Sequence, residues 1–136
     1  MSLDKVLGIS ASGMTVQSAR LRIVAENIAN AGSLAETTGG DPYRRKLITF
    51  KTVFDDTIGA NVVRVANISY DHSNFGRKHD PNHPAADKDG FVKIPNVKPL
   101  IELTDLREAQ RSYEANLSVI DVAKRMLQRT IGILNG

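Results

Sequence analysis

The sequence predicts an α+β protein with two long terminal α-helices, paired as a coiled-coil-like hairpin, and a small β-rich middle domain. Apolar residues recur every seven positions near both ends of the chain, and the middle is rich in Val, Ile and Thr with turn residues between them. The chain has 136 residues, which allows one ordinary domain or two small ones. The expected division is 1–31 and 100–136 for the terminal-helix domain and 32–99 for the middle domain.

A helix is expected over residues 3–31 because its apolar positions keep the seven-residue spacing of a packed helix seam. These positions are Leu7, Met14, Leu21 and Ile28. Gly8 and Gly13 each cost about 1 kcal/mol relative to alanine inside a helix. The first helix is therefore expected to be firm only when it is packed against neighbours.

The segment 32–99 changes in composition. Residues 32–42 are rich in small, turn-favouring side chains and are expected to form a loop. Three stretches rich in Val, Ile, Thr or Phe are expected to be strands: 45–54, 61–70 and 91–94. The intervening segment 71–89 is polar and contains two prolines, so it is expected to be a loop.

A second helix is expected over residues 100–134, because apolar residues again recur every seven positions. Proline at position 99 is tolerated at a helix start. Its seven-residue row is Leu106, Tyr113, Ile120, Leu127 and Leu134. Further apolar residues lie outside both rows: Val6, Ile9, Val16, Ile23, Val119, Val122 and Ile133. A helix that is apolar on more than one side needs more than one neighbour, so packing against other subunits is expected.

Composition excludes several classes of function. With no cysteine there is no disulfide, thiolate nucleophile or cysteine-bound zinc. The net charge is +3, with both signs mixed along the chain, whereas a nucleic-acid-binding protein concentrates basic residues on one face. No stretch is long and apolar enough to span a membrane, and the first residues lack the continuous apolar core of a secretory signal.

The histidine-containing loop is the strongest candidate for chemistry. His72, His79 and His83 lie in one polar segment with several aspartates, and such side chains can bind zinc or iron. Pro81 and Pro84 prevent the helical spacing that a two-histidine motif requires. No G-x-S-x-G or phosphate-binding glycine pattern is present. We therefore expect no enzyme activity, no metal and no cofactor.

Several segments resemble the bacterial flagellar axial proteins, which comprise rod, hook and hook-associated proteins. Residues 25–30 are similar to the asparagine-rich signature near their N-terminus, and residues 111–116 are similar to their C-terminal helix. Residues 80–97 resemble the proximal-rod members in particular. The residues carrying these signatures are Asn27, Asn30, His83, Pro84, Gly90, Pro95, Asn96, Tyr113 and Asn116. The chain departs from the family at Ala31-Gly32-Ser33, where a threonine often follows the asparagine signature.

The resemblance implies a structural subunit of the proximal rod that helps to transmit motor torque across the periplasm. It also implies flagellar type III export without a cleaved signal peptide. The implied partners are other rod proteins, copies of the same chain, ring and export-gate components at the rod base, and the export apparatus. The paired helices would form an inner tube and the β-rich segment an outer layer.

Other readings of the sequence remain open. Another flagellar rod subunit would share the same signatures. A cytoplasmic coiled-coil adaptor would form a discrete oligomer from the same two helices. A metalloenzyme built on the histidine loop would contain stoichiometric metal and would lose activity when His79 or His83 is replaced.

Overall fold

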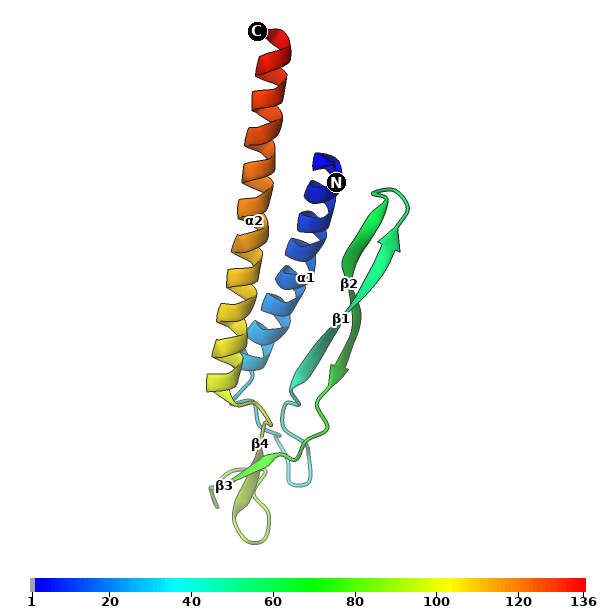
Figure 1. The fold of residues 1–136 in the computed structure, drawn as a ribbon. Helices are drawn as coiled ribbons and strands as arrows, with labels where there is room; N and C mark the ends of the chain where they lie inside the picture. The colour runs from blue at the N-terminus through cyan, green and yellow to red at the C-terminus, as the bar shows by residue number, and fades with distance from the viewer. Residues whose placement is uncertain (1) are drawn as a thin grey trace. The chain divides into compact units, whose positions relative to one another are not determined.

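The computed structural model describes residues 2–136 (Figure 1). Its elements in chain order are α1 (Leu3–Ala29), β1 (Lys46–Asp55), β2 (Ala60–Tyr70), β3 (Gly76–His79), β4 (Phe91–Ile94) and α2 (Pro99–Asn135). The predicted α+β class, with two long terminal helices and a small β region between them, is confirmed.

The two helices end where their sequences provide stop or start signals. α1 ends at Ala29, two residues before the expected position. There Asn30 donates from Nδ2 to the carbonyl of Glu26 at 2.9 Å and accepts the Ser33 hydroxyl at 3.0 Å. The first bond adds a second donor to the Glu26 carbonyl, which also accepts the Asn30 N–H at 3.0 Å, and the second links Asn30 to the loop that follows. α2 begins at Pro99, where the missing proline N–H would have no helical partner.

The strands form two separate two-stranded sheets, β1–β2 and β3–β4. The turn between β1 and β2 is held by Asp55, whose Oδ1 accepts the N–H groups of Thr57 at 2.9 Å and Ile58 at 3.2 Å. Gly59 closes the turn with a φ of 74°, which costs little without a Cβ. β3 and β4 are antiparallel, with Gly76 opposite Ile94 and His79 opposite Phe91.

The prediction of a continuous loop over 71–89 is wrong, because β3 lies inside it. β3 is polar and exposed along its whole length, so it carries no apolar alternation that could indicate a strand. It is a strand because pairing with β4 satisfies its backbone groups. Gly76 allows this pairing, since a Cβ there would lie 2.8 Å from Cγ1 of Ile94.

The chain divides into two compact units. The first unit comprises residues 2–21, 49–67 and 107–136, and the second comprises 22–48 and 68–106. The buried residues of the first unit are Ser10, Ser12, Val16, Val62, Ala109 and Ala123. Those of the second include Ile23, Val24, Asn27, Val92, Val97 and Glu102. Both cores are small and mix apolar with polar side chains.

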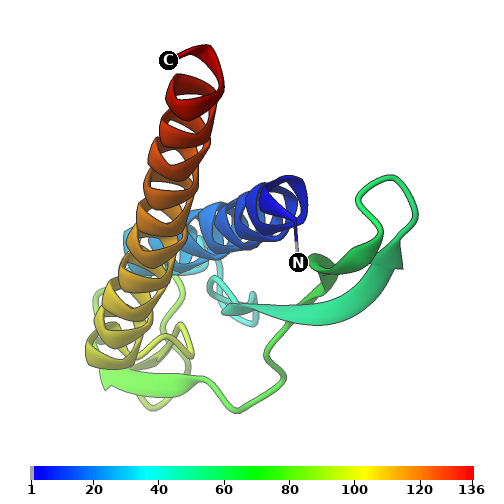
Figure 2. The same ribbon diagram turned by 45° about the horizontal axis from the view of Figure 1, so that its top comes forward.

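In the first unit α1 lies between α2 and the β1–β2 hairpin (Figures 1 and 2). The two helices are antiparallel there, and α2 continues past the start of α1. Among residues 2–136, neither helix is both long and apolar enough for a membrane crossing.

Candidate assembly site

Small residues let the helices and the hairpin of the first unit approach closely. A Cβ on Gly13 would lie 2.7 Å from Nδ2 of Asn116, and a Cβ on Gly8 would lie 2.9 Å from Cδ1 of Ile58. The Ser12 hydroxyl donates to the carbonyl of Ile9 at 2.7 Å and accepts the N–H of Val63 at 3.3 Å. The run of small residues near the start of α1 is therefore a contact face for both α2 and β2.

The predicted apolar rows lie at the edges of this packing. Leu7, Met14, Leu21 and Ile28 are half-buried, as are Leu106, Tyr113 and Ile120, whereas Leu127 and Leu134 are exposed. The buried positions of α2 form a different seven-residue row, which contains Glu102, Ala109 and Ala123. The inner face of α2 is therefore small and polar, and its large apolar residues face outward or lie at the edges.

Two open apolar grooves are present in the first unit, each lined by both helices. One of about 440 Å³ is lined by Leu3, Val6, Val119, Val122, Ala123 and Met126. The other, of about 490 Å³, is lined by Ala11, Met14, Thr15, Ser18, Tyr113 and Ile120. Val122 is 48% exposed and Met126 is 53% exposed. Contiguous exposed apolar surface of this kind is typical of interaction sites.

The apolar surface continues along the last turns of α2. Leu127, Ile131, Ile133 and Leu134 are all exposed, and Leu134 is 80% exposed. Lys124, Arg125 and Arg129 accompany them. This end of α2 is therefore amphipathic and has no cover within the part of the chain that the structure describes.

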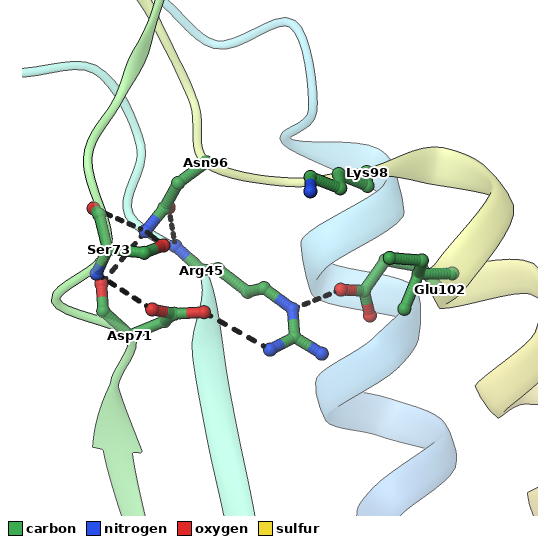
Figure 3. A pocket seen from close by; sticks show the side chains of 7 residues that line it. Arg45, Asp71, Ser73, Asn96, Lys98 and Glu102 are labelled. Atoms are coloured by element: carbon green, nitrogen blue, oxygen red, sulfur yellow. Dashed lines mark hydrogen bonds and ion pairs between the residues drawn. The ribbon is translucent and has the colours of Figure 1, made fainter.

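The second unit is held by a polar cluster around Arg45 (Figure 3). The Arg45 guanidinium pairs through Nε with Oε1 of Glu102, a residue with 0% exposure. It also lies 3.3 Å from Oδ2 of Asp71 and 3.7 Å from Oδ2 of Asp105. Burial alone would lower the pKa of Arg45, but hydrogen bonding and charge attraction from Glu102 and Asp71 outweigh it and raise the pKa. The arginine therefore remains a cation.

Asn27 joins α1 to the start of β1 within this unit. Its Nδ2 donates to the carbonyl of Lys46 at 3.0 Å, and its Oδ1 accepts the N–H of Lys46 at 2.9 Å. The same Oδ1 accepts the Tyr43 hydroxyl at 2.7 Å, and Nδ2 lies 3.4 Å from Oε2 of Glu102. The amide group supplies both the donor and the acceptor that these bonds require, and Asn27 is 1% exposed.

Asn96 has an equivalent role for the loop after β2. Its Oδ1 accepts the N–H of Arg45 at 2.8 Å, and its Nδ2 donates to the carbonyl of Asp71 at 2.9 Å and to Ser73 (Figure 3). Asn27, Asn30 and Asn96 therefore all bind main-chain groups. Sequence reasoning identified them only through family resemblance.

Sequence reasoning missed Arg45, Asp71 and Glu102. Arg45 was visible as part of a basic run at the start of a strand, and Glu102 as an acidic residue in the first turn of a helix. Neither position indicates burial, because such charges are usually solvated. A buried pair between residues 57 apart in sequence leaves no local pattern.

The remaining signature residues of the second unit shape the turns near β4. His83 Nδ1 accepts the N–H of Ala85 at 3.0 Å, and the carbonyl of Pro84 accepts the Thr38 hydroxyl at 3.3 Å. Gly90 has a φ of 82°, a backbone conformation that favours glycine. Pro95 is buried.

The other two histidines are not gathered into a metal site. The His79 ring packs edge-on against Phe91, with ring centroids 5.0 Å apart. His72 is exposed. Within residues 2–136, no three His, Cys, Asp or Glu side chains are grouped so that they could hold a metal ion.

Asp71 gives the second unit an acid-sensitive contribution to stability. The pKa of its carboxyl is lowered by the Ser73 N–H, then by the Ser73 hydroxyl and by Arg45. This carboxylate stabilises the fold at pH values above its pKa in the unfolded chain, which is about 4. The stabilisation is lost as the pH falls through its lower pKa in the folded chain. We expect Asp71→Asn to reduce the urea midpoint at about pH 6, with a difference from wild type that shrinks towards about pH 3. Equal differences at both pH values, or an equal effect of the exposed Asp56→Asn control, would contradict this.

Comparison with known proteins identifies the family. Residues 88–133 match the family described as flagellar basal body rod FlgEFG protein C-terminal. The flagellar basal-body rod protein FlgC of Agrobacterium fabrum is 51% identical over 126 residues, which cover 93% of this chain and 91% of that protein. The FlgC proteins of Borreliella burgdorferi and Escherichia coli O6:H1 are 36% and 34% identical, over 100% and 96% of this chain and 100% and 97% of their own lengths. The chain therefore belongs to the FlgC family of flagellar basal-body rod proteins.

Proposed function

We propose that this chain is a structural, non-enzymatic subunit of the proximal rod, which helps to transmit motor torque across the periplasm. The observation that carries the proposal is the pair of open apolar grooves on a helix pair in a member of the FlgC family. A subunit that works alone has no need of such surfaces, whereas a subunit of a tubular assembly needs one for each neighbour.

The neighbours are other rod proteins and further copies of this chain. Their helices would cover the two grooves and the exposed end of α2. The two seven-residue rows would complete these contacts: Leu7, Met14, Leu21 and Ile28 of α1, and Leu106, Tyr113, Ile120, Leu127 and Leu134 of α2. In the assembly, residues 1–31 and 100–136 would form the inner helical layer and residues 32–99 the outer layer. Ring and export-gate components would meet the subunit at the rod base.

Delivery to the rod would use the flagellar type III export apparatus without a cleaved signal peptide. The absence of cysteine supports a final position outside the cytoplasm, because no thiol is exposed to oxidation there. The signature residues Asn27, Asn30, His83, Pro84, Gly90, Pro95 and Asn96 would act within the subunit, by holding turns and segment junctions rather than by touching partners.

The test is a charge placed in the first groove. Val122→Asp should leave folding of the single chain nearly unchanged, because the side chain is already 48% exposed and surface substitutions usually change stability by within about 0.5 kcal/mol. In a strain lacking the wild-type gene, the variant should be produced but absent from purified basal bodies, since assembly would bury its charge. Swimming should be lost.

The matched control is Gln110→Asp, which adds the same charge at an exposed position of α2 that lines neither groove and precedes the apolar end of the helix. This variant should enter basal bodies and support swimming. Equal incorporation of Val122→Asp and wild type would exclude the groove as an assembly contact. Absence of the wild-type chain from purified basal bodies would overturn the proposed function itself.

A further inference from the structure

Gly13 of α1 faces the side chain of Asn116 of α2 in the first unit. A Cβ on Gly13 would meet the Asn116 side chain at 2.7 Å from Nδ2 and at 3.0 Å from both Cγ and Oδ1. All three terminal heavy atoms of the amide therefore occupy the space that any other residue at position 13 would need. Asn116 Nδ2 also donates to the carbonyl of Ser112 at 3.0 Å, which holds the amide in one orientation.

The positions on either side of Asn116 offer nothing comparable. Ala109 lies seven residues before it and Ala123 seven residues after it, and both are buried. A row of alanines is nearly flat, so it opposes sliding of one helix along the other only weakly. Asn116 projects from this flat row, and Gly13 provides a recess of matching size.

From this we infer that Asn116, seated on Gly13, sets the axial register of the two terminal helices. Sliding α1 by one turn would bring position 9 or 17 towards Asn116, and these positions carry Ile9 and Gln17. Neither side chain leaves room for an amide at the distances that Gly13 allows. A single polar residue in a helix seam can specify register in this way.

A second contact agrees with this register. Arg20 NH2 lies 3.1 Å from Oε2 of Glu108, seven residues from Gly13 on one helix and eight from Asn116 on the other. The Glu108 side chain is largely exposed, and exposed pairs contribute about 0–1 kcal/mol. The ion pair therefore follows the register and is too weak to set it.

Register matters because each groove takes residues from both helices. The 440 Å³ groove combines Leu3 and Val6 of α1 with the segment of α2 around Val122. A slide of one turn would displace these residues by about 5.4 Å and change the surface that a neighbour meets. Asn116 is thus a positioning residue for assembly. This consequence rests on the proposed function, whereas the register itself does not.

The test uses the absence of natural cysteine. Ser18→Cys and Lys124→Cys, both at exposed positions, accept spin labels, and pulsed electron paramagnetic resonance gives the distance between them in the purified full chain. The parent should show one narrow distance distribution. Adding Asn116→Ala should broaden it or add populations displaced by about one helical turn, 5.4 Å. Helix content should not fall, since alanine favours helix more than asparagine does.

Gln110→Ala serves as the matched control, because it lies on the exposed side of the same helix and should keep the narrow distribution. Gly13→Ala should disturb the distribution as Asn116→Ala does, because it forces the amide out of its recess. A broad distribution in the parent, or an unchanged one in Asn116→Ala, would overturn the inference. If register changes while swimming persists, register is set by Asn116 but assembly tolerates a slide.

Discussion

Replacing Arg45 with methionine is expected to destabilise the full chain by about 3–5 kcal/mol. Glu102 has 0% exposure, and Arg45 supplies its paired cation. Methionine keeps the aliphatic length of the arginine side chain but leaves a carboxylate buried without its counter-charge, which is the costly way to break such a pair. Urea unfolding followed by circular dichroism measures the loss.

Two variants separate charge from packing. The double variant Arg45→Met with Glu102→Met should recover most of the lost stability, because an apolar pair of similar volume often replaces a buried ion pair at little cost. Arg44→Met should cost only about 1 kcal/mol, since it removes a stacking contact with Phe75 and bonds to two carbonyls but leaves no buried anion. Equal losses for Arg44→Met and Arg45→Met would contradict this account.

The helices were predictable because their signal is local and long. Seven-residue spacing extends over both ends of the chain. One residue indicates the end of α1, near Asn30, and one indicates the beginning of α2, at Pro99. Strands β1, β2 and β4 were predictable from their Val, Ile, Thr and Phe content. β3 was not, because its stability comes from pairing with a segment that follows it rather than from its own residues.

The side of each helix that is buried within the subunit was harder to predict than the helix itself. Apolar periodicity indicates which residues avoid water but not what covers them. In α2 the covered positions are the small and polar ones, Ala109, Ala123 and Glu102, because small residues permit close helix contact. The large apolar residues at the end of α2 have no cover within one chain. A row that looks like an internal seam can therefore be a surface for neighbours.

The polar cluster of the second unit could not be predicted from any local pattern in the sequence. Asn27 was recognisable as part of a signature, but its two bonds to Lys46 and its approach to Glu102 depend on three segments that are distant in sequence. No periodicity or spacing relates these segments. Their chemistry becomes apparent only when folding brings them together.

Asn27→Asp is expected to cost about 3 kcal/mol or more at neutral pH, although it changes a single atom of the side chain. The carbonyl of Lys46 loses its donor, and an unsatisfied buried acceptor costs about 1–3 kcal/mol. The introduced carboxylate would also face Oε2 of Glu102, which lies 3.4 Å from the present Nδ2. Two carboxylates at this distance, in a site where Asn27 is 1% exposed, repel each other strongly.

The pH dependence distinguishes this repulsion from a simple loss of packing. Burial and the neighbouring carboxylate would raise the folded pKa of the introduced group above its unfolded value of about 3.9. The destabilisation should therefore be small near about pH 4, where the protonated acid can again donate to Lys46, and should grow as the pH rises above the unfolded pKa. Asn30→Asp makes the same chemical change beside a helix end rather than beside Glu102, so it should cost only about 0.3–1 kcal/mol. A loss in Asn27→Asp that is independent of pH between about 4 and 7 would mean that packing, and not the paired carboxylates, accounts for the role of Asn27.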